Sequence, residues 1–101
     1  MERKPDKEAF LEEANEALLE EDWAYQYLLE LASSRFIWVR VMVAEALANC
    51  VSSRGKRVLL PLLQDRHPLV RAEALDSSRY FSGEDLRNTL QESMMKDSHY
   101  S

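Results

Sequence analysis

The chain has 101 residues, a net charge of −5 and an apolar content of 46%. This length allows one small domain, residues 1–101, and the apolar content excludes an intrinsically disordered chain. The single cysteine, Cys50, excludes an internal disulfide, and no apolar run approaches the roughly 18 residues that span a membrane. Because the amino terminus also lacks an apolar signal core, we expect a cytoplasmic location and no membrane partner.

Strong helix formers, chiefly Ala, Leu, Glu, Arg and Lys, recur along the sequence, which contains only two glycines and three prolines. The predicted fold class is therefore all-α. Charge is distributed unevenly, because residues 1–34 carry −7, residues 35–79 carry +4 and residues 80–101 carry −2. The basic middle block fits either a mixed solvated surface or a surface that steers an acidic partner, and both interpretations stay open.

The first predicted helix covers about residues 6–20 and belongs to an N-terminal cap, residues 1–21. Its apolar face carries Phe10, Leu11, Ala14 and Leu18, and its other face carries Glu12, Glu13, Glu16 and Glu20. A helix that is apolar on one side only suits the end of a helical stack.

The next two helices, about residues 22–32 and 37–49, form a first hairpin within residues 22–50. Five side chains of the second of these share one face at about 100° per residue and are predicted to lie in the core: Val39, Val43, Ala46, Leu47 and Cys50. Three aromatic residues of the first helix either pack against the cap or form a second binding site: Trp23, Tyr25 and Tyr27.

A second hairpin is predicted within residues 51–81, with a turn at residues 52–55, a fourth helix ending near Gln64 and a fifth at about residues 68–81. The core face of the fifth helix is predicted to be Val70, Ala74, Ser77, Ser78 and Phe81. Its two serine hydroxyls are expected to bond to carbonyls one turn earlier. Residues 82–101 are predicted to form a partial third repeat or a C-terminal cap, with the apolar stripe Leu86, Leu90 and Met94.

The two hairpins repeat each other. Val39-Arg40 returns as Val70-Arg71 at an offset of 31 residues, and Asp65-Arg66-His67 returns as Asp97-Ser98-His99 at an offset of 32. A period in the low thirties with two helices per unit is typical of an α-solenoid. The sequence therefore predicts about two and a half helical hairpins, or roughly six helices.

Residues 59–75, LLPLLQDRHPLVRAEAL, resemble a HEAT repeat, and SRFIWVRVMVAEALAN resembles the second half of another. The pattern is also similar to the short HEAT-like units of phycobilisome lyases, and it covers about residues 22–100. The resemblance implies that a loop aspartate and the arginine after valine link neighbouring repeats. The residues at these positions are Arg40, Asp65 and Arg71, with Asp97 next in line, whereas Ser34 stands where the first repeat would carry its aspartate.

No residue pattern supports catalysis or a bound metal. His67 and His99 occupy matching loops without a third or fourth ligand, and Cys50 lies on a predicted core face as an inert thiol. The acidic stripe of the first helix is a solvated surface, and the sequence has no glycine-rich phosphate loop. We therefore expect a protein that is not an enzyme and that holds no cofactor.

The resemblance implies that the second helix of each hairpin lines a concave face where partners usually bind. Opposite the predicted core lie Trp38, Val41 and Glu45 on one helix, and Leu69, Ala72, Asp76 and Arg79 on the other. These seven residues form the predicted partner-binding surface. Trp38 is either an exposed anchor for the partner or packs between repeats, and both interpretations stay open.

The favoured function is that of a non-catalytic scaffold or adaptor for a protein partner. Three alternatives stay open: a chaperone or lyase subunit like those of phycobilisomes, a small immunity or inhibitor protein, and a nucleic-acid-binding repeat. The +4 middle block favours the last, and the pI of about 5.0 opposes it. A homodimer is also left open, as is whether the chain is a whole protein or part of a longer repeat array.

Overall fold

A computed structural model describes residues 6–81. Their elements are, in chain order, α1 (Lys7–Glu13), the 3-10 turn η1 (Leu18–Glu20), α2 (Asp22–Ala32), α3 (Ile37–Ala46), the 3-10 turn η2 (Leu47–Asn49), α4 (Ser53–Leu62) and α5 (Pro68–Ser78). Every regular element of this part of the chain is helical, which confirms the all-α class. The helix predicted after residue 82, with Leu86, Leu90 and Met94, lies outside the described residues.

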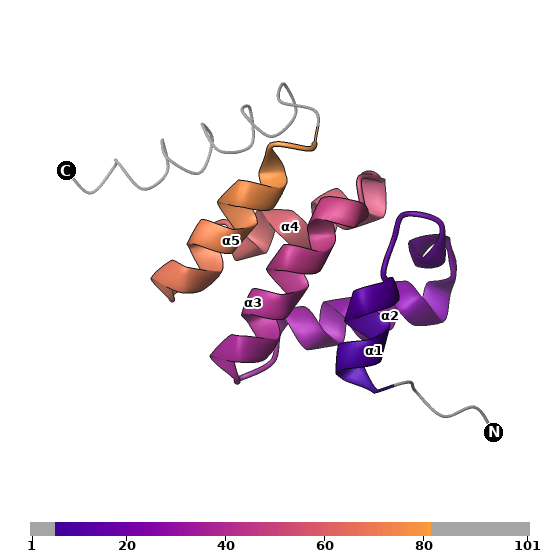
Figure 1. The fold of residues 1–101 in the computed structure, drawn as a ribbon, viewed down its shortest axis with the longest axis horizontal. Coiled ribbons are helices and arrows are strands. Elements are labelled where there is room, and N and C mark those ends of the chain that lie inside the picture. The colour runs from indigo at the N-terminus through magenta and orange to yellow at the C-terminus, as the bar shows by residue number, and fades with distance from the viewer. Residues whose placement is uncertain (1–5, 82–101) are drawn as a thin grey trace.

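The helices form two layers. Helices α1, α3 and α5 lie side by side in one layer, and α2 and α4 lie behind them in the other (Figure 1). The most extensive packing joins α3 to α5, and the hairpins α2–α3 and α4–α5 connect the layers. This arrangement is the predicted short solenoid, in which α1 occupies the layer of the second helices, beside α3.

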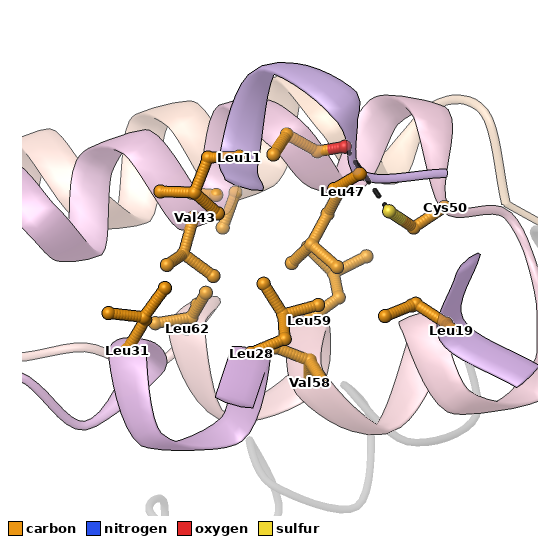
Figure 2. Close-up of a cluster of buried hydrophobic side chains, with 14 of the residues drawn as sticks. Leu11, Leu19, Leu28, Leu31, Val43, Leu47, Cys50, Val58, Leu59 and Leu62 are labelled. Atoms are coloured by element: carbon orange, nitrogen blue, oxygen red, sulfur yellow. Dashed lines mark hydrogen bonds between the residues drawn. The ribbon is translucent and has the colours of Figure 1, made fainter. Parts of the chain in front are cut away.

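The core lies between these two layers. Val43 and Leu47 point from the α3 layer toward leucines of α2 and α4, including Leu28 and Leu59 (Figure 2). All five residues predicted for the core face of the third helix are buried, as are Val70, Ala74, Ser77 and Phe81 of the fifth. The helical periodicity therefore identified these core residues correctly, but Ser78, which was also predicted for the core face, is only half-buried.

The first helix is shorter than predicted. Helix α1 ends at Glu13, and Ala14 has φ −58° and ψ 132°, which lie outside the helical region. The cause is Asn15, whose side chain donates to the carbonyl of Glu13 and accepts from the N–H of Leu18. These local bonds replace the helical ones, so the prediction of one helix over residues 6–20 is wrong in its middle.

The turn predicted at residues 52–55 is also wrong, because α4 begins at Ser53. Ser52 caps the helix, and its hydroxyl accepts from the N–H of Gly55 at 3.1 Å. Gly55 has no positive φ and lies in the first turn of α4. Its backbone packs against the carbonyl of Cys50, where a Cβ atom would collide. Glycine is required here by this close approach and not by a turn.

The two serines of α5 behave differently from each other. Ser78 donates to the carbonyl of Leu75 within the same helix, as predicted. Ser77 is buried and donates instead to the carbonyl of Ala44 in α3, at 2.6 Å. Its hydroxyl therefore joins neighbouring repeats, a role that helical periodicity could not indicate.

Candidate functional site

Two arginines support the loops that precede α3 and α5. Arg40 donates through Nη1 to the carbonyl of Ser34 at 2.8 Å, and Arg71 donates through Nη1 to the carbonyl of Asp65 at 2.7 Å. Both arginines therefore hold the carbonyl six residues earlier. The two repeats therefore have the same arginine-to-carbonyl hydrogen bond at equivalent positions, 31 residues apart.

Arg40 also crosses to the next repeat. Its Nε lies 2.8 Å from Asp65 Oδ1 and its Nη2 lies 3.1 Å from Oδ2, so the pair is bidentate. Burial alone would raise the pKa of Asp65, but hydrogen bonds from Arg40 and from the N–H of His67, with the charges of Arg40 and Arg66, hold that pKa below its usual value. Asp97, the next aspartate implied by the resemblance, lies outside the described residues.

Arg54 forms a second connection between repeats. It donates to the carbonyl of Leu19 at 2.8 Å and to Asp22 Oδ1 at 2.7 Å, and its Cζ lies 4.7 Å from the ring centroid of Tyr25. Sequence reasoning missed this connection. The only available signal was the opposite charge of Asp22 and Arg54 at corresponding places in the first turns of α2 and α4.

The seven residues predicted to bind a partner lie on α3 and α5. Trp38 is 70% exposed and Leu69 is 51% exposed, and they occupy matching positions 31 residues apart. Four others are also exposed: Glu45, Ala72, Asp76 and Arg79. Val41 is half-buried and packs against the core.

The aromatic residues of α2 pack against the cap. Phe10 of α1 lies 4.7 Å from Tyr27 and 5.8 Å from Trp23, measured between ring centroids. Tyr27 is buried, and Tyr25 lies under Arg54. These contacts anchor α1 to α2, while Trp23 stays 46% exposed.

A groove of about 450 Å³ lies between α1 and α3. Its lining residues are Glu8, Leu11, Glu12, Met42, Glu45, Ala46 and Asn49. Sequence reasoning did not find this groove, because α1 reaches α3 only through tertiary packing. Of its lining residues, only Glu45 was among the predicted partner contacts.

The residues considered as a nucleophile or a metal ligand, Cys50 and His67, form hydrogen bonds within the protein. Cys50 is buried and donates its S–H to the carbonyl of Ala46 at 3.5 Å. Burial, and then the charge of Glu16, raise the pKa of the Cys50 thiol to about 11. His67 Nδ1 accepts from the N–H of Leu69 at the start of α5, and His99 lies outside the described residues. Within residues 6–81, no group of three His, Cys, Asp or Glu side chains could hold a metal ion.

None of the helices between residues 6 and 81 is both long enough and apolar enough to cross a membrane. A family model described as HEAT repeats matches residues 25–101. Comparisons with curated proteins and with solved structures gave no significant match. The match is to HEAT repeats in general, so the similarity to phycobilisome lyases stays a prediction.

Proposed function

The chain belongs to the family of HEAT repeats, which generally mediate contacts between proteins, and from this premise we propose that it is a non-catalytic scaffold with one protein-binding face. The proposed face is the exposed side of the layer formed by α1, α3 and α5 (Figure 1). The observation that carries this proposal is the exposure of Trp38 and Leu69 at matching positions of adjacent helices. Large exposed apolar side chains are typical anchors of protein interfaces.

The internal connections support a rigid surface. Ser77 bonds to Ala44 across the α3–α5 contact, and Arg40 pairs with Asp65 beside it. A surface that is already ordered loses little conformational entropy on binding. Trp38 and Leu69 are therefore presented at a fixed spacing, which favours one specific partner geometry.

Nucleic-acid binding has less support than protein binding. Arg40, Arg54 and Arg71 of the basic middle block donate to the protein itself, and Arg79 pairs with Asp76 at 3.0 Å. Affinity for nucleic acid comes mainly from cations that contact phosphates. Because at least four of the eight cations of this block are engaged internally, its +4 charge supports nucleic-acid binding less than the sequence alone indicates.

Site-specific photo-crosslinking in the native cell tests the proposed face. A photoreactive phenylalanine derivative is placed at Trp38, at Leu69 and, as a control, at Arg57, which is exposed on α4 in the other layer. We expect one discrete protein adduct from positions 38 and 69 and none from position 57. Adducts from position 57 alone, or a nucleic-acid adduct from all three, would contradict the proposal.

A further inference from the structure

We propose that the partner binds the groove between α1 and α3 through a basic, amphipathic segment that carries an apolar side chain flanked by Lys or Arg. This inference rests on the proposed function and specifies the chemistry of the partner.

The floor of the groove is apolar. Leu11 of α1 is 5% exposed and Ala46 of α3 is 7% exposed, and the half-buried Met42 lies between these helices. A floor of this kind gains stability by covering an apolar side chain. Methionine also adapts its shape to different apolar groups. The volume of about 450 Å³ accommodates one or two side chains of a partner but not a whole helix.

The walls of the groove are acidic. Glu8 and Glu12 lie one turn apart on α1, and Glu45 faces them from α3, whereas none of the lining residues within residues 6–81 is Lys or Arg. Within residues 6–81, none of these three carboxylates forms an ion pair. Because like charges face each other without a compensating cation from the described part of the chain, a cationic partner relieves their repulsion on binding.

The carboxylates suit a chain of cations better than a single ion. They do not converge closely enough to form a metal site in the described part of the chain. Lys and Arg side chains reach such dispersed carboxylates while their aliphatic stems cover apolar surface. Three spaced carboxylates around an apolar floor therefore match an amphipathic basic segment.

The helical spacing of α3 places the exposed Trp38 on the same side of the helix as Glu45 of the groove. Glu45 and Trp38 are seven residues apart on α3, which is about two helical turns or roughly 10 Å along the axis. A segment that neutralises Glu45 can thus continue to Trp38, where an Arg or Lys gains from contact with the aromatic ring. The groove and the predicted partner-binding residues then form one surface.

The test uses a fluorescein-labelled 16-residue peptide with Leu at helical spacing and Lys at the flanking positions. Its binding is measured by fluorescence anisotropy at low and moderate salt. Two control peptides replace every Lys by Glu or every Leu by Ser. We expect binding by the Lys/Leu peptide alone, with an affinity that falls as salt rises. Failure of this peptide to bind, or equal binding by the Glu peptide, would overturn the inference.

Matched protein variants locate the binding. The combined change Glu8→Gln, Glu12→Gln and Glu45→Gln should weaken binding by about tenfold. The control change Glu13→Gln, Glu20→Gln and Glu21→Gln alters net charge equally at exposed positions outside the groove, and it should weaken binding by less than about twofold. An equal loss in both variants would indicate general attraction to an acidic protein and would overturn the inference.

Met42→Asp provides an independent readout. It increases the negative charge of the groove but makes the floor polar, so we expect weaker binding despite stronger attraction. Unchanged or tighter binding would show that the floor takes no part and would contradict the inference. Circular dichroism checks that each variant folds.

The two proposals fail in different ways. A partner crosslinked through Trp38 whose attached segment is acidic would leave the proposed face intact and overturn the basic-segment inference. The crosslinked species could also be a second copy of this chain, attached through a segment that is not basic. This result would likewise leave the proposed face intact and overturn the basic-segment inference. Absence of any adduct at position 38, with adducts at position 57, would overturn the proposed face itself.

Discussion

At Gly55, in the first turn of α4, a close contact with the backbone of Cys50 leaves no room for a side chain. Replacing a helical glycine by alanine usually stabilises a helix by about 1 kcal/mol. At Gly55 the added Cβ meets the carbonyl of Cys50, which is backbone and cannot rotate away. The effect of Gly55→Ala should therefore have the opposite sign.

We expect Gly55→Ala to lower the free energy of unfolding by about 2–4 kcal/mol. Urea denaturation followed by circular dichroism measures the change. Ser53→Ala, at an exposed position of the same turn, should stay within about 0.5 kcal/mol of wild type. A stabilised Gly55→Ala variant would show that the two backbones can separate at no cost.

Asp65 makes the free energy of unfolding depend on pH in the acidic range. The native pKa of Asp65 is lowered, so its contribution is fully present above the pKa of an unfolded aspartate, about 3.9. The contribution is lost as pH falls through the native pKa. The difference in unfolding free energy between wild type and Asp65→Asn should therefore shrink below about pH 4. A constant difference from pH 7 to pH 2 would contradict this assignment.

Substitutions of Arg40 test the same Arg40–Asp65 pair from the side of the arginine. Arg40 is 5% exposed, and replacing it by Ala removes both guanidinium bonds to Asp65, which keeps only the N–H of His67, and removes the side-chain donor of the Ser34 carbonyl. We expect Arg40→Ala to destabilise the protein by about 2–4 kcal/mol in urea denaturation. Arg40→Lys should recover only part of this loss, because an ammonium group cannot bind both carboxylate oxygens in the same plane. Full recovery would show that charge alone matters.

Cys50 should be slow to react in the native protein. Its buried thiol has a pKa of about 11, so little thiolate exists near pH 8. We expect a disulfide reagent to label Cys50 at least tenfold more slowly than it labels the protein in urea. Equal rates would require frequent opening of the segment that connects η2 to α4.

At the scale of elements, the contact between α3 and α5 depends on Ser77. Its hydroxyl is buried and bonds to the carbonyl of Ala44, whereas the neighbouring Ser78 bonds within its own helix. Ser77→Ala should cost about 1–2 kcal/mol of unfolding free energy, and Ser78→Ala should change it by less than about 0.5 kcal/mol. Similar effects of the two substitutions, measured in urea, would show that the bond across the helices contributes nothing.

The elements also show what local sequence could predict. Periodicity placed α2, α3, α4 and α5 close to their observed bounds, because each helix buries a regular apolar face. It failed at Asn15, where one side chain competes for backbone bonds, and at Gly55, where another segment approaches. These exceptions depend on single contacts that leave the apolar spacing unchanged.

At the scale of the whole molecule, substitutions of Trp38 and Arg79 distinguish an effect on partner binding from an effect on stability. Both are exposed, so Trp38→Ala and Arg79→Glu should each change the unfolding free energy by less than about 1 kcal/mol. Trp38→Ala should weaken binding to the crosslinked partner by about thirtyfold, whereas Arg79→Glu, which leaves the groove and Trp38 unchanged, should change it by less than about threefold. Calorimetry measures the binding. Unfolding by either change would assign that residue a structural role.

Only part of the candidate surface could be predicted from the sequence. Helical spacing placed Trp38 and Leu69 opposite the core, and both are exposed. The groove was missed because it depends on how α1 lies against α3, which no local pattern specifies. The connection through Arg54 was missed for the same reason, because its partners precede it by more than thirty residues.

The matched arginines have a consequence for engineering. Arg71 holds the loop of its own repeat as Arg40 does, and Arg40 also donates to Asp65 of the following repeat. The repeat of residues 51–81 therefore has both halves of this connection, with Asp65 bound to the preceding repeat and Arg71 at the position that corresponds to Arg40. We expect that a duplicate of residues 51–81 inserted after Phe81 would present its own aspartate to Arg71. The molecule could then be lengthened one hairpin at a time without designing a new interface.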